Sequence, residues 1–185
     1  MTFNAPIDLL AAFALGAFPT KTLLNFAKEQ AKKRFNISAE PSQAEEPTLH
    51  KIQGQTADMI DRLSEEGLNS SEHIANADPI RLLLRTNFGW KVILDTIDQA
   101  ILFNYIGQKI EQLRPIGIRG AIEMVEVGKG LVSTDPDVKT HAEQTLGLIA
   151  SKLGEDEHGV RNLIQTLVAD PQVGFIFSLW GEAVV

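Results

Sequence analysis

Hydrophobic side chains recur at the three- and four-residue spacing of helices along most of the chain. The clearest case lies within residues 90–113, where every fourth residue from Ile93 to Tyr105 is hydrophobic, which predicts one long core helix. Asp-Pro pairs at 78–79, 135–136 and 170–171 are typical of helix starts. The sequence therefore predicts an all-α, multi-helical fold without a sheet.

The last third of the chain is predicted as three acidic helices. Residues 134–185 carry eight acidic and three basic residues. Gly154 should end the first helix, and the acidic run 155–157 should begin the second, where negative charge suits the helix dipole. The third helix is hydrophobic around most of its circumference, so it should be buried or form a protein interface. The interface residues that we predict in it are Phe175, Phe177 and Trp180.

The first 35 residues are apolar and then basic. Residues 5–18 are nearly all apolar, but they are fewer than the ~20 residues that span a bilayer. After Pro19, residues 21–35 form a predicted second helix, and its basic side chains are Lys21, Lys28, Lys32, Lys33 and Arg34. Two hypotheses remain open. This helical pair packs on the rest of the chain or on a second copy, which we prefer, or the basic residues contact a membrane surface.

A linker is predicted over residues 36–47. This segment has two prolines, three glutamates and one large apolar side chain, too little to offset the entropy of ordering it. The predicted organisation is therefore a helical pair at 1–35, the linker, and a compact helical domain at 48–185.

An internal repeat lies in the middle of the chain. Residues 59–74 and 109–124 align without gaps at an offset of 50. The pairs that match are Ile60 with Ile110, Leu63 with Leu113, Gly67 with Gly117, Leu68 with Ile118, and Ile74 with Met124. In each copy a helix should end before a left-handed glycine, and a second short helix should follow. In the first copy, Asn69 with Glu72 is the predicted cap of that second helix.

The two copies resemble the helix-hairpin-helix family of DNA-handling proteins, over residues 48–80 and more weakly over 105–130. In that family a glycine-hydrophobic-glycine turn holds a phosphate. The first copy departs from this pattern, because it reads Gly54-Gln55-Thr56 and is followed by Asp58. In the second copy the resemblance implies a phosphate or nucleic-acid contact, and the residues concerned are Lys109, Arg114, Gly117, Arg119 and Gly120.

The chain is also loosely similar to the soluble regions of uncharacterised bacterial membrane proteins. The features that carry this resemblance are the hairpin unit, a long helix that begins near Trp90, and a last helix that begins at Asp170-Pro171. The resemblance implies no particular activity.

Composition and charge narrow the classes of function. The formal net charge is -7, which disfavours nucleic-acid binding driven mainly by electrostatics. Residues 1–35 are an exception, with five basic and two acidic residues. The absence of cysteine excludes disulfides, thiol catalysis and cysteine-ligated metals.

No catalytic or cofactor motif stands out. The four histidines have no metal-ligand spacing, and phosphate-binding loops, nucleophile elbows and dinucleotide fingerprints are missing. The cluster 155–158 is explained by helix-start electrostatics rather than by a metal. Asp95 and Asp98 are expected on a solvated helix face. We therefore predict no cofactor, no metal, no small-molecule substrate and no enzyme activity.

The function that these observations favour is a non-catalytic helical protein-interaction or scaffold module. It is predicted to be cytoplasmic, at or near the inner face of a membrane, with a protein partner or self-association. The alternative is a nucleic-acid-binding helix-hairpin-helix protein.

Overall fold

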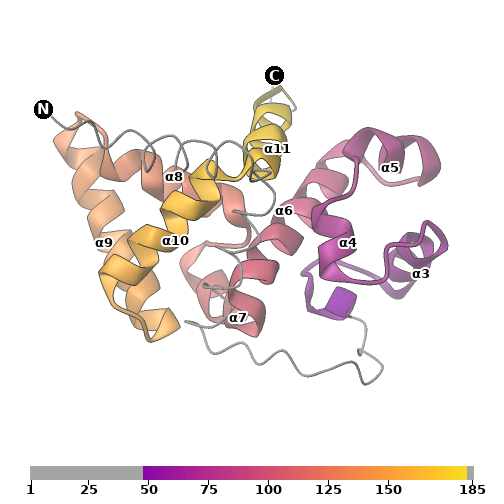
Figure 1. Ribbon diagram of the computed structural model, residues 1–185, viewed down its shortest axis with the longest axis horizontal. Helices are drawn as coiled ribbons and strands as arrows, with labels where there is room; N and C mark the ends of the chain where they lie inside the picture. The colour runs from indigo at the N-terminus through magenta and orange to yellow at the C-terminus, as the bar shows by residue number, and fades with distance from the viewer. Residues whose placement is uncertain (1–47, 183–185) are drawn as a thin grey trace, which may run out of the picture.

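The computed structural model describes residues 48–182, and this part of the chain is all-α with no strand (Figure 1). The α-helices are α3 (Ala57–Glu65), α4 (Ser71–Ala75), α5 (Pro79–Arg85), α6 (Trp90–Ile106), α7 (Ile110–Leu113), α8 (Ala121–Leu131), α9 (Pro136–Leu153), α10 (Glu157–Ala169) and α11 (Pro171–Glu182). Short 3-10 helices are η1 (Thr48–Lys51), η2 (Gly107–Lys109) and η3 (Arg114–Ile116). The predicted helical pair at 1–35 and the linker at 36–47 lie outside the described residues.

Helix α6 is the centre of the fold. Its neighbours are α4 and α5 on one side and α8 and α11 on the other, and Figure 1 shows it between the α3–α5 group and the α7–α10 group. Most of its side chains are buried, including polar Thr96, Asp98 and Gln99. One continuous hydrophobic core surrounds it, from Leu49 near the start of the described chain to Ile176 in α11.

The predicted long helix at 90–113 is divided in the structure. Helix α6 ends at Ile106 because Gly107 has φ 58° and ψ -140°, a conformation that only glycine adopts readily. The chain then continues as η2 and α7. Hydrophobic periodicity runs through the break, since Ile110 and Leu113 are also buried, and this is why the pattern predicted one helix.

The two repeat copies have the same turn. Gly67 and Gly117 are left-handed, with φ 81° and 87°, as predicted. In each copy the next amide donates to the carbonyl five residues back, at 2.9 Å after Gly67 and 3.2 Å after Gly117. In each copy the glycine amide donates to the carbonyl three residues back. These two bonds make a Schellman motif, so the sequence repeat is also a repeat of backbone geometry.

Side-chain caps fix most helix starts where the sequence placed them. Asp78 and Asp135 accept hydrogen bonds from the first turns of α5 and α9, and Asp156 accepts from Gly159 in α10. The predicted cap at Asn69 is wrong by one residue. Ser70 is the cap of α4, and its hydroxyl accepts from the His73 amide at 3.2 Å.

The helices of the described segment are each too short or too polar to cross a membrane.

Candidate functional site

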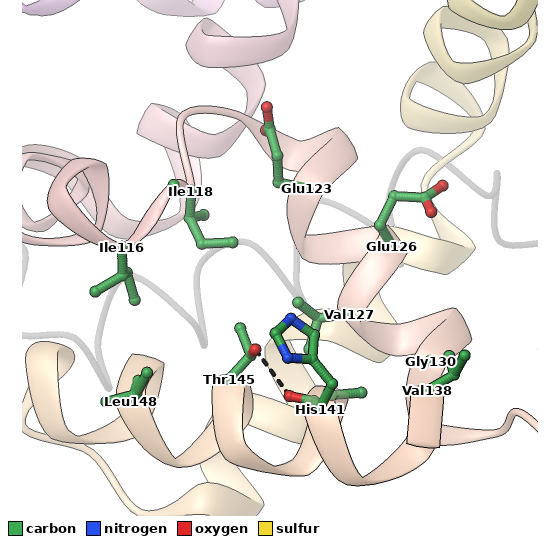
Figure 2. A pocket seen from close by; sticks show the side chains of 12 residues that line it. Ile116, Ile118, Glu123, Glu126, Val127, Gly130, Val138, His141, Thr145 and Leu148 are labelled. Atoms are coloured by element: carbon green, nitrogen blue, oxygen red, sulfur yellow. Dashed lines mark hydrogen bonds between the residues drawn. The ribbon is translucent and has the colours of Figure 1, made fainter. Parts of the chain in front are cut away.

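A groove of about 490 Å³ lies between α8 and α9 and reaches the second glycine turn (Figure 2). Both helices and the turn contribute to its wall. The lining residues are Ile116, Gly117, Ile118, Glu123, Glu126, Val127, Gly130, Val138, His141, Ala142, Thr145 and Leu148. Most of these side chains are apolar, so an apolar ligand surface would be desolvated favourably there.

Close packing at one end of the groove fixes the position of α8. A Cβ atom added to Gly130 would lie 2.7 Å from the Cβ atom of Ala142 in α9, so the two helices can approach this closely only because residue 130 is glycine. The opposite end is closed by Ile116 and Ile118, which flank Gly117. The groove is thus framed by the contact between Gly130 and Ala142 at one end and by the Gly117 turn at the other.

The two glutamates that line the groove make its wall acidic. Glu123 and Glu126 line it from α8, and none of the lining residues is lysine or arginine. The side chain of Glu123 also accepts from the Gly120 amide at 2.8 Å. Glu126 forms an exposed ion pair with Lys129 at 3.3 Å, which offsets its charge only in part because the pair is solvated.

The first repeat copy forms a hollow at equivalent positions, with a volume of about 580 Å³. Six of its lining residues have a partner at an offset of 50 in the groove. These are Glu66, Gly67, Leu68, His73, Asn76 and Ala77, paired with Ile116, Gly117, Ile118, Glu123, Glu126 and Val127. Their chemistry differs, because the first hollow also contains Glu72, Asp78 and Arg81. The two copies therefore share a shape, and the second is the more apolar one.

The basic residues predicted to contact phosphate bond to acceptors within the chain. Lys109 Nζ donates to the Leu153 carbonyl at 3.1 Å and lies 3.5 Å from Glu155 Oε1. Arg114 Nη2 donates to the Lys51 carbonyl at 2.5 Å. These contacts hold the second repeat copy to α9 and to η1. Lys109 and Arg114 thus each have a structural partner within the chain.

Arg119 joins a polar cluster on α6. Its Nη2 donates to Asp95 Oδ2 at 2.9 Å, and the same oxygen accepts from the buried Gln99 side chain at 2.8 Å. Gln99 in turn exchanges two hydrogen bonds with the backbone of Gln53. Of the predicted contact residues, only Gly117, Arg119 and Gly120 lie together in one turn, and the phosphate contact stays a prediction.

The prediction that Asp98 lies on a solvated helix face is wrong. Asp98 is buried, and its Oδ1 accepts from the Ile122 amide at 2.9 Å, at the start of α8. A Cβ atom on Gly120 would lie 1.8 Å from Asp98 Oδ2, so residue 120 must be glycine for this approach. Burial, together with the charge of Glu123, raises the pKa of the Asp98 carboxyl to about 8. An internal carboxyl therefore occupies the helix start where the resemblance implies phosphate.

The spacing of polar residues in the sequence could have predicted this polar cluster. Asp98 and Gln99 follow Asp95 by three and four residues in a helix that is mostly apolar. Asp98 has the same helical phase as the core residues Leu94 and Ile101, so periodicity alone places it inside.

The predicted interface on α11 is partly covered. Phe175 is exposed, whereas Phe177 and Trp180 are half-buried against the core. Lys129 Nζ lies 3.3 Å from the centroid of the Phe177 ring, a cation–π contact. Phe175 is thus the member of the three that can reach a partner. The predicted membrane-contact residues Lys21, Lys28, Lys32, Lys33 and Arg34 lie outside the described residues.

No group of three side chains that could ligate a metal occurs within residues 48–182. No family model, curated protein or solved structure matches the chain.

Proposed function

We propose that the protein is a non-catalytic helical interaction or scaffold module that binds an amphipathic helix in the groove between α8 and α9. The supporting observation is the combination of a mainly apolar lining with two glutamates and no lysine or arginine. Helices that dock into such grooves bury apolar side chains at every third or fourth position. Glu123 and Glu126 would favour a helix that carries lysine or arginine beside its apolar stripe.

Selection from a random peptide library against the full chain tests this proposal. We expect enrichment of peptides with apolar residues at helical spacing and flanking basic residues. Leu148→Gln should weaken the selected peptides about tenfold, because it makes the groove polar. Val168→Gln is the matched control, since Val168 is a similarly exposed side chain on α10 and does not line the groove.

The contribution of the acidic groove residues to peptide binding is tested separately. Glu126→Lys should weaken basic peptides, whereas Glu143→Lys, at an exposed α9 position outside the groove, should have little effect. Enrichment of acidic peptides, or equal losses in each variant and its control, would reject the groove as the docking site.

A nucleic-acid-binding helix-hairpin-helix protein is the second candidate, because the Gly67 and Gly117 turns share one backbone geometry. On this alternative, DNA should bind at low salt and dissociate steeply as salt rises. Arg119→Glu should reduce that binding. Absence of binding at low salt would eliminate this alternative.

A further inference from the structure

Helix α5 presents an apolar face to solvent. Ile80, Leu83 and Leu84 are 53%, 41% and 80% exposed, and their spacing places them on one side of the helix. The opposite side packs inward through Pro79 and Leu82. This orientation is unusual, because leucines at helical spacing normally face the core.

The start of α6 contributes two more accessible apolar side chains. Trp90, half-buried, and Val92, 41% exposed, follow α5 after a loop of four residues, 86–89. Figure 1 shows α5 at the edge of the molecule, away from α8 and α9. The surface is therefore separate from the groove.

The charge within α5 and the first turn of α6 is opposite to that of the whole chain, although Arg81 shares the first hollow with Glu66, Glu72 and Asp78. Helix α5 contains Arg81 and Arg85 and no acidic residue, and exposed Lys91 begins α6. Arg85, whose side chain is exposed, forms an ion pair at 3.3 Å with the largely buried side chain of Glu66. The whole chain has a net charge of -7, so basic residues beside an apolar face depart from its general acidity.

We infer that α5 and the start of α6 form a contact surface for an anionic lipid bilayer. Leucine and isoleucine would enter the interface, tryptophan would lie at headgroup depth, and the cations would meet lipid phosphates. The inference does not depend on the proposed groove, because α5 contributes no residue to it.

A second copy of the chain fits this surface less well. The exposed apolar face is confined to one seven-residue helix and the first turn of α6. A stable dimer usually buries about 800 Å² on each partner, which requires about 20 to 30 residues a side. A symmetric pairing would also place Arg81, Arg85 and Lys91 of two copies close together, and like charges oppose such a contact.

Flotation of the full chain with vesicles tests the inference. The chain should float with vesicles of phosphatidylcholine and phosphatidylglycerol and much less with phosphatidylcholine alone. Leu84→Gln should weaken binding about tenfold, because the variant loses a leucine that would be buried in the bilayer. Val132→Gln is the control and should leave binding unchanged. Val132 is also highly exposed, at 82%, but it lies outside α5 and the start of α6. Arg81→Gln should weaken binding about fivefold, with Lys139→Gln as its control.

Tryptophan fluorescence provides a second readout. The sequence has two tryptophans, and Trp180→Phe leaves only Trp90. Anionic vesicles should shift the emission of Trp90 to the blue. Circular dichroism should show that each variant is folded.

Three results would overturn the inference. One is a chain that does not bind anionic vesicles. Another is equal binding by Leu84→Gln and wild type, which would place any membrane contact elsewhere, for instance in residues 21–35. The third is a wild-type dimer that Leu84→Gln dissociates, without vesicle binding, which would assign the face to self-association.

Discussion

At the scale of single residues, Asp98 is the side chain with the most unusual environment. It is buried at the centre of α6 and its carboxyl accepts from the first turn of α8. Helix amides replace the water that a carboxyl would otherwise bind, but burial still penalises its charge. Asp98 thus fixes the angle between the two helices and makes their contact sensitive to protonation.

The stability of the fold should depend on pH through Asp98. Its pKa is about 8 in the folded chain against an ordinary value of 3.8, so the folded state binds the proton more tightly. This contribution is complete below about pH 3.8 and is lost as pH rises toward about 8. Urea unfolding across this range should show a decline for wild type that is absent in Asp98→Asn.

Asp137→Asn is the control for that experiment, because Asp137 is exposed at the start of α9. It should retain the wild-type pH profile. A profile that Asp98→Asn leaves unchanged would show that the carboxyl is not protonated in the fold.

At the scale of elements, the two Schellman turns give the repeat its shape. Both glycines have positive φ, and a Cβ atom at either would meet nothing within 4 Å. The requirement for glycine is therefore purely one of backbone conformation, and it is the same in both copies.

Gly67→Ala and Gly117→Ala should destabilise the protein by similar amounts, about 1 kcal/mol each. Gly174→Ala is the contrasting variant, since Gly174 lies in α11 with open space around it, and it should stabilise by up to ~1 kcal/mol. Thermal and urea unfolding measure these differences. A loss at Gly117 much greater than at Gly67 would show that the turns are not equivalent.

Local features were predictable from the sequence, and features that join distant segments were not. The caps at Asp78 and Asp135 and the left-handed Gly67, Gly117 and Gly154 depend on a few neighbouring residues. The role of Asp98 depends on an amide 24 residues away. The groove arises only when α8 packs on α9, so Gly117 could be singled out but Leu148 could not.

At the scale of the whole molecule, one buried hydrogen bond joins the last helix to the centre. The Tyr105 hydroxyl donates to Asp170 Oδ2 at 2.9 Å, and both side chains are buried. Burial and Asp170 hold the pKa of Tyr105 well above its ordinary value, so the phenol remains a donor. Asp170 also accepts from the Gln172 amide in α11, so it connects α11 to α6.

Tyr105→Phe should destabilise the protein by about 1.5–3 kcal/mol, because a buried carboxylate loses a donor. Thr166→Val removes an exposed hydroxyl that donates to the Asn162 carbonyl and should change stability by less than ~0.5 kcal/mol. Urea unfolding compares the two. Equal effects would mean that the Tyr105 bond contributes no more than a surface contact.

The carboxyl of Asp98 at the start of α8 also has a mechanical consequence. Separating α8 from α6 would break the buried hydrogen bond from the Ile122 amide to Asp98, so these two helices should move as one body. The other wall of the groove is α9, which follows α8 after the exposed residues Val132, Thr134 and Asp135. If a ligand requires a wider groove, the displacement should therefore fall on α9, with the segment 132–135 as its hinge.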